Sequence, residues 1–471
     1  MNVRQIAGPD AAFLYGERPE WPFHVSALML IDPTGTDRFS FDAVVDLLER
    51  RLHKVPQFRW KLVEGPLHMR LDRPIWVDDP EFDVHHHITK IAVPGPGDDR
   101  ALGELVGRLV SIKLDRTRPL WEMWFIEGLA DGRCGLLAKI HHSIIDGQSG
   151  MELATLLYDS EADPEPDPEP PPYEPEPQPA MAERLVVGAA NATLWPLRAS
   201  RLTRQIVRQG ATMGRHLLGS SVAAQPFQAP RTPLNGRLTS ERSFADAEVS
   251  LAEVKRVKDA FGVKVNDGVL ALSASALRSY LLEHDALPST PLVAQVPVSL
   301  RNNGGDARAV GTQVAAMFCS LATNVGRADN RLKVIHRSTD SGKEMRRQLT
   351  DAHEESLTDA LPPALLAIAA RAWSLAGLDD RSPPVFNLII SNVAGPPFDL
   401  YMAGARIDAM YPMGPLLAGS GLNITVVSTA DSLDFGLQAC PALVPDVWDI
   451  ADRIGPALDE LSEAADAVES A

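Results

Sequence analysis

The sequence predicts a mixed α/β protein built from two lobes, and three observations lead to this prediction. The chain has 471 residues, which is long for one core because compact domains usually contain about 100 to 200 residues. A stretch rich in proline and acidic residues, 159–179, interrupts the chain after its first third. Segments with the apolar patterns of strands and of helices occur on both sides of this interruption. Each side can therefore form an α/β lobe of its own.

The first lobe is expected to span residues 1–158 and to carry both kinds of element. Continuous apolar runs predict strands, and apolar residues at helical spacing predict helices. Ser149 is a plausible cap for the last helix because its hydroxyl can accept from the amides of the first turn. In chain order we expect a strand at 23–31, a helix at 41–52, a strand at 135–140 and a helix at 149–158.

The second lobe is expected to span residues 236–471. The same two patterns recur in it, so it also has α/β character. In chain order we expect helices at 251–261 and 268–282, strands at 292–298 and 385–391, and a pair of strands at 422–427 and 433–438.

Residues 159–235 connect the two lobes. The prolines of 159–179 lack a backbone donor and its acidic side chains repel one another, so an extended, solvated linker is expected. The stretch 194–218 is basic in an otherwise acidic chain, and as a helix it would be amphipathic. Its apolar side would carry Trp195, Leu202, Ile206 and Met213, and its basic side Arg198, Arg201, Arg204 and Arg208. Such a helix could rest on anionic lipid or a lipid droplet, or it could pack on the acidic lobes of its own chain.

Charge and composition exclude several classes of protein. A formal net charge of -17 argues against nucleic-acid binding, which needs a surplus of Lys and Arg. The cysteines Cys134, Cys319 and Cys440 are far apart and lack the spacing of a zinc or redox site. Residues 1–15 lack the apolar core of a signal peptide, and no apolar run approaches the roughly 20 residues that span a bilayer. We expect a cytoplasmic protein whose contact with the inner membrane face or with lipid droplets, if it makes any, is peripheral.

The strongest chemical signal is the stretch His141-His142-Ser143-Ile144-Ile145-Asp146-Gly147, between a predicted strand and a predicted helix. A neutral imidazole, with an ordinary pKa near 6.5, can take the proton of a hydroxyl as that hydroxyl attacks a carbonyl. Asp146 can fix the loop, and Gly147 permits backbone angles that a side chain would forbid. The alternative is a pair of histidines that merely ends a core strand.

The His-His-x-x-x-Asp-Gly arrangement resembles the signature of coenzyme A-dependent acyltransferases related to chloramphenicol acetyltransferase and to condensation domains. Three further segments resemble motifs of the bacterial, actinobacterial-type wax ester synthase/acyl-CoA:diacylglycerol acyltransferase family. They are Pro119-Leu120-Trp121, Asn266-Asp267 and Asn392-Val393-Ala394-Gly395-Pro396. The resemblance implies two chloramphenicol acetyltransferase-like lobes, each a mixed sheet flanked by helices, with an active-site tunnel at their interface.

The resemblance also implies a reaction. The family moves a long acyl chain from acyl-CoA to diacylglycerol, which gives triacylglycerol, or to a fatty alcohol, which gives a wax ester. His142 would be the general base that activates the acceptor hydroxyl for direct attack on the thioester, and His141 would support the loop or the acceptor site. Acyl-CoA would be a co-substrate, with no tightly bound cofactor. The alternatives are another alcohol as acceptor, a condensation-type enzyme with a carrier-bound donor, and a non-catalytic lipid-binding protein.

The other motif residues each have a functional and a structural interpretation. Asn266 could donate to the acyl oxygen, whereas Asp267 could simply cap the following helix. Pro119, Leu120 and Trp121 could line the acyl channel or pack in the core. Asn392, Gly395 and Pro396 could shape the channel or form an ordinary turn. No metal is expected, because the consecutive histidines His85, His86 and His87 point their side chains apart.

Overall fold

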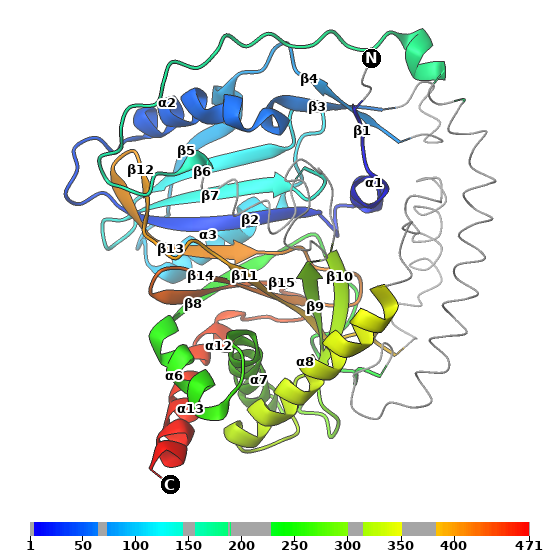
Figure 1. Cartoon of the computed structure of the whole chain (residues 1–471), viewed down its shortest axis with the longest axis vertical. Helices are drawn as coiled ribbons and strands as arrows, with labels where there is room; N and C mark the ends of the chain where they lie inside the picture. The colour runs from blue at the N-terminus through cyan, green and yellow to red at the C-terminus, as the bar shows by residue number, and fades with distance from the viewer. Residues whose placement is uncertain are drawn as a thin grey trace.

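The computed structural model describes residues 4–64, 73–144, 156–186, 189, 228–299, 314–350 and 383–470. These residues form two six-stranded sheets and one three-stranded sheet, with helices on their faces (Figure 1). The predicted mixed α/β class with helix-flanked sheets is confirmed.

The sheet of the N-terminal lobe has the strand order β12-β13-β2-β7-β6-β5 and is antiparallel except for the pair β5 and β6. Its two faces are covered by α2 and α3, each packed on its own apolar cluster. The strands are β2 (His24–Asp32), β5 (Ile88–Ala92), β6 (Trp121–Glu127), β7 (Cys134–His141), β12 (Leu400–Met402) and β13 (Ala405–Met413), and the helices are α2 (Phe41–Arg51) and α3 (Asp99–Ser111).

A smaller layer lies beside this sheet and carries the first helix. It is a three-stranded sheet of order β1-β4-β3, and α1 packs near it through a buried cluster that includes Ile6, Leu14 and Trp76. Its elements are β1 (Arg4–Gln5), α1 (Gly8–Gly16), β3 (Trp60–Val63) and β4 (Ile75–Asp78); the neighbouring short 3-10 helices are η1 (Leu52–Lys54), η2 (Pro56–Arg59) and η4 (Val84–His86).

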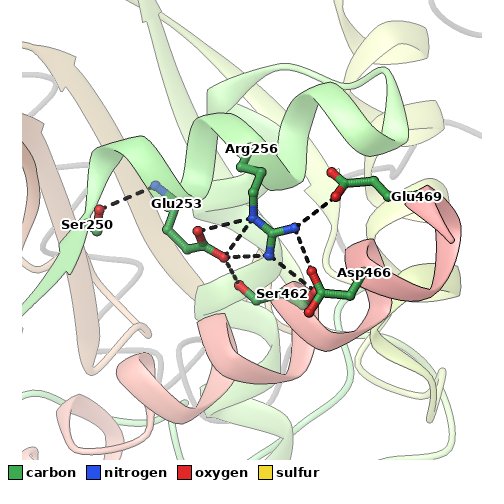
Figure 2. A network of polar contacts seen from close by, with 6 residues as sticks. All are labelled: Ser250, Glu253, Arg256, Ser462, Asp466 and Glu469. Carbon is green, nitrogen blue, oxygen red and sulfur yellow. Dashed lines mark hydrogen bonds and ion pairs between the residues drawn. The ribbon is translucent and has the colours of Figure 1, made fainter.

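The C-terminal lobe is a mixed sheet of order β10-β9-β11-β14-β15-β8 whose helices enclose the largest apolar cluster. Arg256 of α6 joins this helix to the C-terminal helix α13, because its guanidinium pairs with Glu253 of α6 and with Asp466 and Glu469 of α13 (Figure 2). The strands are β8 (Ser243–Ser250), β9 (Val293–Ser299), β10 (Val314–Ser320), β11 (Leu388–Ala394), β14 (Leu422–Ser428) and β15 (Ser432–Ala439), and the helices are α6 (Leu251–Phe261), α7 (Val265–Glu283), α8 (Ala328–Thr350), α12 (Trp448–Ala451) and α13 (Ile454–Glu469).

The two lobes are joined by a strand exchange. After β11 the chain leaves the C-terminal lobe, and β12 and β13 complete the sheet of the N-terminal lobe. The buried carboxylate of Asp434 on β15 accepts from the backbone N–H of Met410 on β13 at 2.8 Å. At Gly436 the two strands come so close that an added Cβ would lie 2.0 Å from the carbonyl oxygen of Pro412. The division of the chain near residue 236 therefore does not divide the two sheets.

The acidic linker is extended, as predicted, but it is bound to the N-terminal lobe rather than fully solvated. It crosses the outer side of this lobe (Figure 1), where Arg51 pairs with Asp159 and Asp167 at 2.5 Å each. From 164 to 173 every third residue is partly buried and the residues between them are exposed. This period of three is the one that a polyproline II helix produces.

Most predicted elements are present, and two differ in a way that matters for the motifs. The helix predicted at 268–282 begins at Val265, so Asn266 and Asp267 lie in its first turn. The strand predicted at 385–391 is β11, which continues to Ala394 and so includes Asn392. The predicted helix at 194–218, and all but the end of the one at 149–158, lie outside the described residues.

Replacing Gly436 by alanine tests how closely the lobes are joined. The new methyl group meets backbone and not a movable side chain, so we expect the free energy of unfolding to fall by about 1 to 3 kcal/mol. Urea unfolding followed by circular dichroism measures this loss. Gly455→Ala, in helix α13 with no other part of the chain within 4 Å of the added Cβ, is the matched control and should be at least as stable as the wild type, because alanine is favoured over glycine in a helix. Equal stability of the two variants would contradict the close crossing of β13 and β15.

Candidate active site

The two histidines follow one another where β7 ends, and backbone hydrogen bonds hold them from both sides. His141 is the last residue of β7 and lies opposite His24 of β2. Its N–H donates to the carbonyl oxygen of Leu120 at 2.9 Å, and the N–H of His142 donates to that of Phe23 at 2.8 Å. The chain is thus attached at this point to the start of β6 on one side and to the entry of β2 on the other.

The ring of His141 is buried and locally bonded. Its Nδ1 accepts from the N–H of Ser143 at 3.1 Å and lies 2.7 Å from the Ser143 hydroxyl, which can donate to the same atom. Because Nδ1 accepts, the proton of the neutral ring is assigned to Nε2. Burial, followed by the charge of Arg116, holds the pKa of His141 well below its usual range. His141 is therefore a neutral, fixed ring at physiological pH.

A buried carboxylate, Glu17, faces this ring from the end of α1. Its Oε2 pairs with Arg116 at 2.7 Å and with Lys113 at 3.2 Å, while its Oε1 lies 3.7 Å from His141 Nε2. The side chain of Glu17 is only 1% exposed. No pattern in the sequence marks Glu17 as part of the site. The one available signal is Arg116, because a basic residue next to a buried motif needs an acidic partner to balance its charge.

His142 differs from its neighbour because its ring is only half-buried. The ring stacks on Phe13 of α1 with centroids 4.3 Å apart and an angle of 29° between the planes. A second ring, Phe23, lies 5.5 Å from Phe13. Of the two histidines, His142 is thus the one with a surface that a substrate can reach.

A polar layer supports the strands from the α3 side. Lys139 is fully buried and donates to the carbonyl oxygens of Leu109 and Ile112, at 3.2 and 2.8 Å, where α3 ends. His24 Nε2 lies 2.9 Å from the carbonyl oxygen of Val110, so this nitrogen is the donor. These contacts satisfy carbonyls that have no partner inside the helix. Burial lowers the pKa of both Lys139 and His24.

The Pro119-Leu120-Trp121 segment packs under the histidines and in the core. Leu120 is fully buried in the cluster that holds α1, and its carbonyl oxygen accepts from His141. Trp121 is 1% exposed, donates through Nε1 to the carbonyl oxygen of Phe58 at 2.8 Å and stacks on His87. Pro119 is buried as well. The described contacts of this segment are those of core packing, with Leu120 as its direct link to the histidines.

Asn266 and Asp267 lie in the C-terminal lobe, and the contacts of Asp267 are structural. The Asp267 carboxylate accepts from the N–H of Lys264, the capping interaction considered from the sequence, at 3.0 Å. It also binds His336 Nδ1 at 2.7 Å and accepts from the Thr339 hydroxyl at 2.8 Å, both on α8. Asp267 therefore joins α7 to α8, and none of these contacts brings it to the histidines.

The segment Asn392 to Pro396 ends β11. Asn392 lies in the strand, opposite Val426 of β14, and is half-buried. A Cβ on Gly395 would lie 2.2 Å from the carbonyl oxygen of Ser428, so only glycine fits there. Pro396 follows outside the strand and is half-buried. At this end of β11 the backbone of the segment therefore lies close to the backbone at Ser428.

Asp146 and Gly147 lie outside the described residues, so their expected roles in the loop stay predictions. Of the three consecutive histidines, His87 is buried against Trp121 and the other two, His85 and His86, are exposed. Within the described parts of the chain, no three His, Cys, Asp or Glu side chains gather at distances that suit a metal ion.

Comparison with protein families agrees with the motifs. Residues 6–269 match the wax ester synthase/diacylglycerol acyltransferase catalytic domain. Residues 310–462 match the C-terminal domain of the same family. The chain belongs to the wax ester synthase/diacylglycerol acyltransferase family. It is therefore an acyltransferase.

Individual relatives span nearly the whole chain. A putative diacylglycerol O-acyltransferase of Mycobacterium tuberculosis is 37% identical over 98% of this chain and 91% of its own. The O-acyltransferase WSD of Acinetobacter baylyi is 33% identical over 94% of this chain and 93% of its own. The match therefore covers both lobes and their connection.

Solved structures show the same architecture. The wax ester synthase/diacylglycerol acyltransferase from Marinobacter aquaeolei VT8 is 31% identical, with a TM-score of 0.69 over 98% of this chain and 100% of its own. The first condensation domain of the CDA synthetase is only 15% identical, with a TM-score of 0.54 over 99% of this chain and 96% of its own, and shows a shared fold. The two-lobed fold expected from the resemblance is thereby confirmed.

The substitution Glu17→Gln tests the contact between α1 and the histidine segment. It leaves Lys113 and Arg116 without their shared anion, so we expect a loss of stability of roughly 1 to 3 kcal/mol. The loss stays below that of a fully buried pair because Lys113 and Arg116 are 34% and 30% exposed. Urea unfolding measures it. Glu104→Gln removes an exposed ion pair with Arg108 and should change nothing measurable; a loss of the same size in both variants would show that the buried position of Glu17 is unimportant.

Proposed function

We propose that this acyltransferase transfers a long acyl chain from acyl-CoA to the hydroxyl of diacylglycerol, giving triacylglycerol, and that fatty alcohols can serve as acceptors to give wax esters. The observation that carries the proposal is the pair of histidines within the matched catalytic domain: His141 buried and neutral, His142 partly open. The names of relatives along the full chain support the choice of substrates.

The proposed chemistry needs one base. His142 takes the proton of the acceptor hydroxyl while the oxygen attacks the thioester carbonyl, which gives a tetrahedral oxyanion. When this intermediate collapses, the carbon–sulfur bond breaks and the thiolate of coenzyme A takes the proton back from His142. The acyl group passes directly to the acceptor, so neither an acyl-enzyme nor a tightly bound cofactor takes part, and acyl-CoA is a co-substrate. Donor and acceptor would meet at His142 in a tunnel between the lobes.

His141 and Glu17 have supporting roles in this proposal. His141 cannot easily become charged, so it adds no second positive charge beside the base. Its bonds to Ser143 fix the backbone that follows His142. Glu17 offsets one of the two positive charges that Arg116 and Lys113 bring near the ring of His141. An uncharged, rigid neighbour adds no electrostatic repulsion to the positive charge that His142 carries while it holds the proton.

His142→Ala is the direct test. We expect acyl transfer to fall by a factor on the order of 100 to 10,000, the usual contribution of a general base, while the melting temperature stays close to that of the wild type. Free thiol is followed with purified protein, palmitoyl-CoA and a panel of acceptors that includes dioleoylglycerol and hexadecanol. His86→Ala, which removes an exposed histidine, is the control and should retain full activity. Turnover retained by His142→Ala would rule out His142 as the base.

The same assay separates the alternatives. Thiol release that does not depend on an acceptor would indicate a hydrolase. Transfer from an acyl carrier protein but not from acyl-CoA would indicate a condensation-type enzyme. Folded protein with no transfer to any acceptor would favour a lipid-binding protein.

Peripheral contact with a membrane or lipid droplet is a further part of the proposal. No helix within the described segments is long and apolar enough to cross a bilayer. Just before the basic stretch 194–218, a short helix at 181–186 exposes Met181, Leu185 and Val186 to 57%, 45% and 69%. Exposed apolar side chains followed by clustered arginines suit an anionic lipid surface.

Reversing the charge of that stretch tests the contact. With Arg198, Arg201, Arg204 and Arg208 all changed to Glu, we expect binding to phosphatidylglycerol vesicles in a flotation assay to fall at least about tenfold, since each basic residue near such a surface contributes on the order of 1 kcal/mol. The control changes four exposed arginines elsewhere, Arg50, Arg108, Arg327 and Arg337, to Glu and so matches the total charge. Equal binding of wild type and the 198–208 variant would contradict the proposal, and an equal loss in both variants would mean that only net charge matters.

A further inference from the structure

We propose that Phe13 of α1 is a positioning residue that holds the imidazole of His142 in its working orientation. The inference rests on the proposed role of His142 as the base. Phe13 would not touch the reacting atoms; it would act through the ring on which it stacks. The two rings are nearly parallel, with centroids 4.3 Å apart and 29° between their planes.

The stack is part of a closed set of contacts. The ring of Phe13 also touches the ring of Phe23, with centroids 5.5 Å apart. The carbonyl oxygen of Phe23 accepts from the backbone N–H of His142 at 2.8 Å. His142 is therefore fixed twice by the same pair of phenylalanines, at its backbone by Phe23 and at its ring by Phe13.

Helix α1 gives Phe13 a rigid base. Leu14 and Ala11 of this helix are buried in one cluster with Leu120 of the Pro-Leu-Trp segment. Arg116 donates to the carbonyl oxygen of Leu14. Gly16 allows the ring of Phe23 to come close, since a Cβ there would lie 3.3 Å from it. Phe13 thus projects from an element that is itself anchored to the segment leading into β6, whose Leu120 carbonyl oxygen accepts from the N–H of His141.

One face of α1 meets both histidines. Phe13 and Glu17 are four residues apart, a spacing that places side chains next to each other along a helix. Phe13 contacts the ring of His142, and Glu17 lies 3.7 Å from the ring of His141. Each histidine of the motif therefore has its own partner, Phe13 on α1 for His142 and Glu17 at the C-terminal cap of α1 for His141.

Stacking on Phe13 restrains the orientation of the His142 imidazole, and proton transfer requires a fixed orientation. One flat face of the imidazole is covered, so the ring cannot turn about its side-chain bonds without losing the contact. The stack covers a face of the ring and not the edge that carries the nitrogens, of which Nδ1 is buried. Transfer rates depend steeply on such alignment, because a misplacement of about 1 Å can lower a rate by about 100-fold. An aliphatic side chain of similar size would fill the space without this restraint.

Phe13→Leu separates positioning from space filling. We expect kcat to fall by about tenfold while KM changes by less than about twofold, because the ring loses alignment and not substrate contacts. Phe13→Tyr keeps an aromatic ring and should restore most of the rate. Phe39→Leu, which breaks a comparable aromatic pair with Phe125 far from the motif in sequence, is the matched control and should behave like the wild type. If Phe13→Leu does not fold, Phe13→Met takes its place with the same expected result.

A second measurement follows the exposure of the His142 ring and does not depend on catalytic activity. Diethyl pyrocarbonate modifies exposed imidazoles, and peptide mass spectrometry gives the rate at His142. We expect this rate to rise several-fold in Phe13→Leu and to stay at the wild-type value in Phe13→Tyr and Phe39→Leu. An active wild type with unchanged kcat in Phe13→Leu would overturn the inference, as would an unchanged modification rate. An inactive wild type would instead overturn the proposed function, and the inference with it.

Discussion

The hydrogen bonds that tie the end of β7 to its neighbours are the constraint on which the site depends. The N–H of His141 binds the carbonyl oxygen of Leu120, and the N–H of His142 binds that of Phe23. Because both acceptors belong to segments that are themselves buried or paired, the chain cannot shift its register at this point without breaking the sheet. This fixed backbone places the two rings in their different surroundings.

The two histidines differ in their electrostatic surroundings as well as in their position. One ring is buried beside Arg116 and is kept neutral, and the other keeps a face toward solvent and a stacking partner. Glu17 supplies the negative charge that lets Arg116 and Lys113 lie this close to the histidines. The N-terminal helix α1 thus belongs to the site as much as the motif does, although more than 120 residues separate Glu17 from His141.

The lobes form one structure because the chain crosses between them. Strand β13 belongs by sequence to the second half of the chain and by hydrogen bonds to the sheet of the first. The acidic linker reinforces the N-terminal lobe from outside, through Arg51 and its two carboxylates. The acidic side chains repel one another in an isolated linker, but their electrostatic energy becomes favourable when basic side chains of the lobe lie beneath them.

The sequence by itself determined the fold class, the family and the place of the histidine motif. Apolar runs such as 23–31 and 422–427 are strands because a local pattern of side chains decides which surfaces are buried. Local pattern also limited what could be seen: Asn392 looked like part of a turn, yet pairing with β14 extends β11 past it. Tertiary structure alone decided that Trp121 packs in the core, that Asp267 joins two helices and that Phe13 and Glu17 face the histidines. These outcomes depend on contacts between residues far apart along the chain, and no spacing within a single segment encodes them.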